Sequence, residues 1–150
     1  MQFIADAMLG RLARWLRFLG FDTLYYPGIS DAKLIRIARE NNRFILTRDT
    51  RLVQRKGLKD VLLIHANDSL HQLVEVVTSL KLKQFDTLSR CVRCNGQLTK
   101  IHDRVKVRDM VPEYVFLNRD TFFKCTECDR IYWEGSHPKK FRESLNHILQ

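Results

Sequence analysis

The four cysteines constrain this chain most strongly, because they fall into two Cys-x-x-Cys pairs with none left over. Cys91 and Cys94 form the first pair, and Cys125 and Cys128 form the second, with residues 95–124 between them. Two thiolates three positions apart can bind one metal ion from a single tight turn, and two such turns complete a tetrahedral site. The spacing therefore predicts a zinc ribbon in which all four cysteines hold one structural zinc ion.

Paired cysteines have two other uses, a redox motif or disulfide bonds. A redox pair would need a thioredoxin-like strand and helix around it, which neither pair has. Disulfides are rare in the cytoplasm, where this protein is expected: Met1–Leu9 lacks a signal peptide's basic and apolar regions, and no apolar run is long enough to cross a bilayer. His102, His137 and His147 are not needed as ligands, because four cysteines already saturate the ion.

The first half of the chain alternates short apolar runs with helical patterns, which is typical of a parallel α/β sheet with flanking helices. We expect strands at 2–5, 23–26, 44–47 and 61–64. The first expected helix carries Leu9, Leu12, Leu16 and Leu19 and stops at Gly20. The second runs from a cap at Ser30 to Glu40, and a short third helix ends near Lys56. The fourth begins at a cap formed by Asn67 or Asp68 and continues to Leu80.

A polar, basic stretch from Lys81 to Arg90 is interpreted as a linker, which divides the chain into predicted domains at 1–82 and 88–150. Beyond the linker, short runs at 104–107, 114–117 and 121–124 have the composition of strands. A helix is expected from about Pro138 to the end, because its apolar residues recur at helical spacing: Phe141, Leu145, Ile148 and Leu149.

Three of the acidic residues in the first half share one topological position. Asp6 follows the first predicted strand, Asp31 opens the helix after the second, and Asp49 follows the third. In a parallel sheet these points lie at one edge, where converging carboxylates repel unless a hard cation such as Mg²⁺ or Mn²⁺ neutralises them. The alternative interpretation is that each aspartate stabilises a helix N-terminus.

The chain carries 26 Lys and Arg residues against 17 Asp and Glu, a formal net charge of +9 that favours a polyanionic partner. Arg11, Arg14 and Arg17 recur at three-residue steps opposite the leucines of their helix, and Arg48 directly precedes Asp49. Such a basic fringe beside an acidic pocket fits a phosphodiester backbone. For the helix arginines, an ordinary solvated helix face explains the pattern equally well.

Taken together, several of these motifs resemble the PIN-like ribonuclease domain with a C-terminal zinc ribbon, which is also found at the end of mutator-seven exonucleases. The resemblance spans essentially the full chain and includes these segments: Asp6, Leu9–Arg17, Leu19-Gly20, Ser30-Asp31, Leu46–Asp49 and Tyr132–His137. It implies a PIN-like α/β fold and metal-dependent RNA cleavage, with Asp6, Asp31 and Asp49 as the metal-binding carboxylates. PIN nucleases often use a fourth acidic residue after a later strand, for which Asp68 is the nearby candidate.

The leading hypothesis is therefore a ribonuclease in which Asp6, Asp31 and Asp49 bind Mg²⁺ or Mn²⁺ while Arg11, Arg14 and Arg48 hold phosphates of the RNA. The alternative is a non-catalytic RNA-binding or ribosome-associated module that uses its basic charge and zinc ribbon alone. Two other classes fit poorly. A phospho-accepting receiver needs an adjacent acidic pair, but alanines flank Asp6, and the chain has neither a G-x-G-x-x-G motif nor a P-loop.

Overall fold

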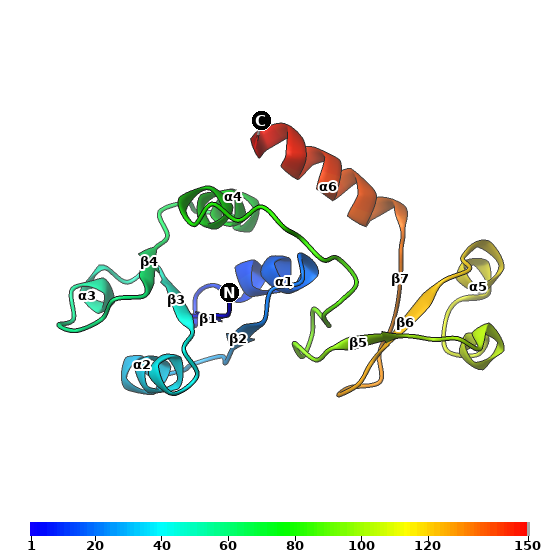
Figure 1. Ribbon diagram of the computed structural model, residues 1–150, viewed down its shortest axis with the longest axis horizontal. Helices are drawn as coiled ribbons and strands as arrows, with labels where there is room; N and C mark the ends of the chain where they lie inside the picture. The colour runs from blue at the N-terminus through cyan, green and yellow to red at the C-terminus, as the bar shows by residue number, and fades with distance from the viewer. Residues whose placement is uncertain (150) are drawn as a thin grey trace.

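The computed structural model describes residues 1–149 and contains a parallel α/β/α layer, a small antiparallel ribbon and a returning C-terminal helix (Figure 1). The layer is built on four parallel strands in the order β2-β1-β3-β4. Their bounds are β1 (Phe3–Ala5), β2 (Thr23–Tyr25), β3 (Phe44–Thr47) and β4 (Val61–Leu63). This confirms the predicted fold class of a parallel sheet with flanking helices, a ribbon and a terminal helix.

Both faces of the parallel sheet are covered by helices, because the side chains of each strand alternate between two apolar cores. Phe3 and Leu46 pack into one core with α1 (Gly10–Phe18) and α4 (Ser69–Ser79). Ile4 and Ile45 pack into the other with α2 (Asp31–Glu40) and α3 (Thr50–Val53). The apolar runs of the strands are explained by this two-sided burial.

Helix boundaries follow local capping chemistry. Ser30, Asp49 and Asp68 each accept a hydrogen bond from an amide in the first turn of α2, α3 and α4 respectively. Helix α1 ends before Gly20, which has a φ of +95°. A β-carbon at Gly20 would also lie 2.5 Å from the carbonyl oxygen of Asp86, so only glycine fits at this contact.

Residues 81–90 pack against the α/β layer. The Asp86 amide donates to the Leu19 carbonyl at 2.9 Å, and Leu82 and Phe85 pack on the core formed by α1 and α4. The predicted domain division between residues 82 and 88 remains a prediction, and the connecting segment is held against the layer.

The ribbon is a three-stranded antiparallel sheet of β5 (Leu98–Lys100), β6 (Phe122–Cys125) and β7 (Ile131–Trp133). Strand β6 confirms the run predicted at 121–124. The predicted strands at 104–107 and 114–117 were wrong: these segments form a 3₁₀ helix, η1 (Arg104–Val107), and α5 (Glu113–Asn118). Asp103 caps η1, and Val107 and Val111 are buried with Phe122 in one apolar cluster against which Val115 packs.

Helix α6 (Ser136–Leu149) crosses back from the ribbon to the α/β layer (Figure 1). The ring of Phe141 stacks on Trp15 of α1 with centroids 4.4 Å apart, and Leu145 is buried in the same core. Both residues face inward as predicted, whereas the side chains of Ile148 and Leu149 lie outside the described ones. No helix among the described residues has the length and apolarity needed to span a membrane.

Candidate active site and metal centre

The carboxyl ends of β1 and β3 form the topological switch point of the sheet. From β1 the chain passes to β2 on one side, and β3 then pairs with β1 on its other side. Open α/β sheets bind ligands in the crevice outside such a point. Asp6 directly follows β1 and Asp49 is the second residue after β3, so two of the predicted site residues flank this crevice.

A buried hydroxyl connects these two aspartates. Thr47 Oγ1 donates to Asp6 Oδ2 at 2.7 Å and accepts the amide hydrogen of Asp49 at 3.0 Å. The Asp6 Oδ1 oxygen accepts from the amide of Ala7 at 2.7 Å. Thr47 was not singled out from the sequence. Its one local signal is that it is the only polar residue in the otherwise apolar run Phe44–Thr47.

Asp49 and Asp31 occupy different positions in their helices. Asp49 Oδ1 accepts from the Arg51 amide at 2.9 Å, so Asp49 caps α3. Asp31 is the first residue of α2, which Ser30 caps, and its Oδ2 lies 3.9 Å from Arg55 Nη2. Asp49 is therefore a helix cap, and Asp31 lies in the first turn of α2, where its charge complements the helix dipole, so the alternative interpretation fits both residues.

The three aspartates share the sheet edge without forming a closed cage. Among the described residues, the four cysteines are the one group of at least three possible metal ligands whose ligand atoms all lie within 4.8 Å of one another. The three aspartates do not form such a group. Mg²⁺ usually retains several waters and is bound by one or two carboxylates together with substrate phosphates. An open carboxylate edge is compatible with that mode of binding.

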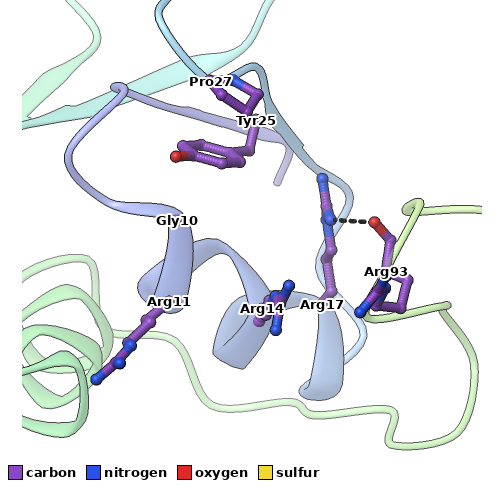
Figure 2. Close-up of a pocket in the computed structure, with 7 residues that line it drawn as sticks. All are labelled: Gly10, Arg11, Arg14, Arg17, Tyr25, Pro27 and Arg93. Atoms are coloured by element: carbon purple, nitrogen blue, oxygen red, sulfur yellow. Dashed lines mark hydrogen bonds between the residues drawn. The ribbon is translucent and has the colours of Figure 1, made fainter.

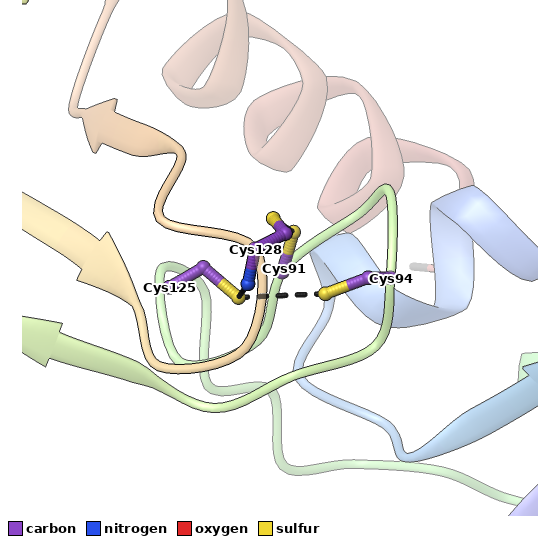
Figure 3. Close-up of side chains that lie close together, drawn as sticks. All are labelled: Cys91, Cys94, Cys125 and Cys128. Atoms are coloured by element: carbon purple, nitrogen blue, oxygen red, sulfur yellow. Dashed lines mark hydrogen bonds between the residues drawn. The ribbon is translucent and has the colours of Figure 1, made fainter.

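The four cysteines are assembled as a metal site (Figure 3). Cys91 Sγ lies 3.7 Å from Cys128 Sγ, and Cys94 Sγ lies 3.4 Å from Cys125 Sγ. A tetrahedral zinc site with Zn–S bonds of about 2.3 Å has sulfur atoms about 3.8 Å apart, so the donor set fits zinc. All four cysteines are free of disulfide bonds.

The backbone of each Cys-x-x-Cys turn supports the sulfur atoms. The turns are residues 91–96, called the first knuckle, and residues 125–130, called the second knuckle. In the first knuckle the Gly96 amide donates to Cys94 Sγ, and in the second the Glu127 amide donates to Cys125 Sγ, both at 3.4 Å. A β-carbon at Gly96 would lie 2.8 Å from Cys125 Sγ, so glycine is required for the knuckles to meet.

The thiols are perturbed in opposite directions. Burial raises the pKa of Cys94 to about 12, whereas for Cys128 the hydrogen bonds from Arg130 outweigh burial and lower the pKa to about 6. Four thiols this close cannot all ionise without a neutralising cation, because their charges repel. The cluster can therefore hold a metal ion such as zinc, which would permit all four thiolates.

Next to the sheet edge, α1 borders a basic cavity of about 500 Å³ (Figure 2). Arg11 and Arg14 line it with exposed side chains, and the wall opposite them is formed by Tyr25 at the end of β2 and by Pro27. Arg93, from the first knuckle, also lines it. The structure thus brings together two of the predicted RNA-binding arginines with one that the sequence had not indicated.

Arg17 does not belong to a solvated helix face. It is 6% exposed, its Nε donates to the Thr23 carbonyl at 2.9 Å, and its Nη1 donates to the carbonyls of Val92 and Arg93 at 3.1 Å. Burial lowers the pKa of its guanidinium group. Arg17 thereby joins α1 and β2 to the first knuckle at the base of the cavity.

Arg48 and Asp68 lie near the ends of β3 and β4, away from the lining of this cavity. Arg48 Nη2 donates to Asn67 Oδ1 at 2.9 Å, in the segment that leads into α4. Asp68 accepts from the His71 amide, which lowers the pKa of the carboxyl group, and so it acts as the α4 cap. Arg48 thus lies at the carboxyl ends of β3 and β4, apart from Arg11 and Arg14.

The fold and these sites define an α/β domain with an acidic strand-end edge, joined to a four-cysteine ribbon. Residues 1–145 match the family model of the Mut7-C RNAse domain, and the chain belongs to this family. The match confirms the resemblance found in the sequence. No curated protein and no solved structure matched the chain.

Proposed function

We propose that this protein is a metal-dependent ribonuclease that hydrolyses RNA phosphodiester bonds at the edge formed by Asp6, Asp31 and Asp49. The observation that carries the proposal is the buried Thr47 hydroxyl, which donates to the Asp6 carboxylate and accepts the backbone amide of Asp49, and so joins the segments that follow β1 and β3 at the switch point of the sheet. The family description supports RNA as the substrate class.

Mg²⁺ or Mn²⁺ bound by the carboxylates would supply an activated water and would neutralise charge on the attacked phosphate. The residues of the chain orient these parts. Thr47 and the Ala7 amide fix the Asp6 carboxylate, while Asp49 is fixed by the first turn of α3. Arg11, Arg14 and Arg48 would bind neighbouring phosphates, because arginine forks match phosphate oxygens.

The ribbon has a structural role in this proposal. Zinc bound by Cys91, Cys94, Cys125 and Cys128 would stabilise the knuckles and extend the RNA-binding surface beside α1. Reduced cysteines of this kind fit the cytoplasmic location that the sequence predicts.

The test is cleavage of mixed single-stranded RNAs with Mn²⁺ by the substitutions Asp6→Asn, Asp31→Asn and Asp49→Asn. We expect each to lower the cleavage rate about a hundredfold or more, because each removes a charged ligand of the cation. Asp60→Asn is the matched control. Asp60 is exposed and lies at the amino end of β4, whereas the candidate site lies at the carboxyl ends of the strands, so the cleavage rate of this variant should equal the wild-type rate. Undiminished cleavage by both Asp6→Asn and Asp49→Asn would overturn the mechanism.

A second candidate function, an RNA-binding module without catalysis, is favoured by the arginine-lined cavity and the net charge of +9. It predicts RNA binding that weakens steeply with salt and does not depend on the three aspartates. Binding without cleavage at any Mn²⁺ or Mg²⁺ concentration, with equal affinity in the Asp6→Asn protein, would select this candidate.

A further inference from the structure

The basic cavity beside α1 holds an excess of positive charge that the protein does not neutralise. Within the described part of the chain, no carboxylate lies within 4.0 Å of a guanidinium nitrogen of Arg11, Arg14, Arg17 or Arg93. By contrast, Arg43 and Arg90 outside the cavity both lie within that distance of Asp22. The four arginines that line the cavity therefore share it without a carboxylate partner among the described residues.

Burying the charged guanidinium group of Arg17 in this cavity costs folding free energy. Its side chain is buried, and the partners of its Nε and Nη1 are neutral carbonyl oxygens. A buried guanidinium group satisfied only by dipoles destabilises the fold unless an anion compensates it. The Asp22 carboxylate and zinc-bound thiolates of the first knuckle would offset part of the Arg17 charge, but Arg11, Arg14 and Arg93 would still leave the cavity positive.

The first knuckle fixes the backbone from which Arg93 extends. Asn95 accepts from the Thr23 amide at 3.0 Å and donates to Asp22 Oδ1 at 2.7 Å, so the knuckle is hydrogen-bonded to β2. Arg93 lies between Cys91 and Cys94, and its carbonyl accepts from Arg17. Its side chain is exposed and makes no hydrogen bond among the described residues, which leaves it free to bind a ligand (Figure 2).

The opposite wall connects the cavity to the candidate active site. The hydroxyl of Tyr25 donates to the carbonyl of Ala7 at 2.8 Å, and the Ala7 amide donates to Asp6. Gly10 allows this packing, because a β-carbon there would lie 2.9 Å from the Tyr25 ring. A strand of RNA lying across the Asp6 edge would thus place a neighbouring part of its backbone at the cavity.

We infer that this cavity is a phosphate-binding subsite for RNA, shared by the α/β layer and the ribbon, in which Arg93 of the first knuckle completes the set formed by Arg11, Arg14 and Arg17. Its ligand is a phosphate group of the RNA with its attached sugar. The volume of about 500 Å³ lies within the range of about 300–1,000 Å³ usual for small-ligand sites. The inference rests on the proposed function for the identity of the ligand, but it does not require that the RNA be cleaved.

Binding can be measured apart from cleavage by fluorescence anisotropy of a short single-stranded RNA, with the Asp6→Asn protein as background and no added divalent cation. Arg93→Ala and Arg14→Ala should each weaken binding about tenfold, because each removes a charge-assisted contact to phosphate. Each should also lower the slope of log affinity against log salt by about 0.7, the value for one phosphate contact on a single strand. Arg93→Lys should recover the slope but not the full affinity, since lysine lacks the planar fork.

Arg36→Ala is the matched control, because Arg36 is exposed on α2, on the opposite face of the sheet, and the net charge changes equally. It should leave affinity and slope unchanged, and all variants should retain their zinc content and unfolding temperature. Comparing RNA with a 5′-phosphate and RNA with a 5′-hydroxyl identifies the phosphate. An effect of Arg93→Ala limited to the former indicates a terminal group, and an equal effect on both indicates an internal phosphodiester.

If Arg93→Ala binds RNA with the same affinity and salt slope as Arg36→Ala, the inference is wrong. That result would leave the cleavage test of Asp6 and Asp49 unaffected. Conversely, wild-type protein that binds RNA through Arg93 but never cleaves it would overturn the nuclease proposal and leave the subsite standing.

Discussion

The cysteine cluster and the acidic sheet edge are both candidate metal sites, but the protein assembles them differently. The cysteines come from two local turns, whose amides donate to the sulfur atoms, and the pairing of β5 with β6 brings the turns together. All four sulfur atoms lie within 4.8 Å of one another. Asp6 and Asp49 lie just past β1 and β3, Asp31 opens α2, and the three carboxylates do not close into a cage.

The difference follows from the charges of the ligands. Thiols can share protons and lie side by side before a metal binds, whereas carboxylates are ionised at neutral pH and repel one another. A thiolate site can therefore be assembled when the protein folds. An acidic site can instead stay open in the folded protein and close only when cation and substrate bind. We expect metal at the ribbon to control stability and metal at the sheet edge to control activity.

Breaking the cysteine cluster should give the largest effect. Cys125→Ser replaces a fully buried ligand in a ribbon whose buried apolar cluster is small, comprising Val107, Val111 and Phe122. Because a structural zinc ion can contribute on the order of 10 kcal/mol to folding, residues 91–133 should unfold while β1–β4 persist. The checks are zinc content by atomic analysis and hydrogen exchange of amides in β6 compared with β3.

Glu127→Gln is the control for this prediction, because Glu127 is an exposed residue of the same knuckle that does not bind the metal. It should retain one zinc ion per chain and full exchange protection. Should the Cys125→Ser ribbon lose zinc yet keep its protected amides, apolar packing would hold the ribbon and the comparison would fail.

Thr47→Val tests the acidic edge with a smaller effect. It removes the hydroxyl between the Asp6 carboxylate and the Asp49 amide and keeps a similar volume in a fully buried position. Because residues that orient metal ligands typically contribute a factor of 10–100, the Mn²⁺ concentration for half-maximal cleavage should rise about tenfold or more. The readout is a Mn²⁺ titration of the cleavage rate, together with the unfolding temperature.

Thr47→Ser restores the hydroxyl and should return the Mn²⁺ requirement to near the wild-type value. A Thr47→Val protein that is less stable but has an unchanged Mn²⁺ requirement would show that Thr47 only packs the core. In that case the acidic edge would not depend on this hydroxyl.

The sequence predicted best where structure depends on neighbours in the chain. The start of α2 follows from Ser30, whose side chain caps the helix that it precedes, and the metal site of the ribbon follows from the spacing within each cysteine pair. The segments 104–107 and 114–117 were predicted as strands because valine, tyrosine and phenylalanine favour strands. In the structure both segments are helical and pack on Phe122, so tertiary packing outweighs local preference here.

The residues that the sequence did not reveal act through distant partners. Thr47 bonds to Asp6 across 41 positions, and Arg17 bonds to Val92 across 75. Periodicity grouped Arg17 with Arg11 and Arg14 opposite the leucines of α1, as either phosphate-binding or solvated residues. It could not show that Arg17 is buried, because the first knuckle that covers it lies in the other half of the chain. Arg93 was overlooked for the same reason.

The smallest predicted effect concerns the junction between the two regions. Asp22 Oδ1 lies 2.7 Å from Arg43 Nη1 in the α/β layer and 2.7 Å from Asn95 Nδ2 in the first knuckle. Burial alone would raise the pKa of this carboxyl group, but its hydrogen bonds with Arg43 and Asn95 lower it below its usual value. Asp22→Asn should destabilise the protein by about 1 kcal/mol at neutral pH, since it leaves Arg43 without its charged partner.

The stabilising effect of the Asp22 carboxylate should decrease as pH falls. A carboxyl group with a lowered pKa in the folded state stabilises the fold above its unfolded pKa of about 3.9, and this contribution is lost as pH falls through the folded value. The difference in unfolding free energy between wild type and Asp22→Asn, from urea titrations, should therefore shrink as pH falls below about 4. Asp86→Asn, on the exposed connecting segment, should show no such difference. If the difference in unfolding free energy between wild type and Asp22→Asn is the same at every pH, the charge of Asp22 does not join the layer to the ribbon. The two metal sites would then lie on units without this electrostatic link.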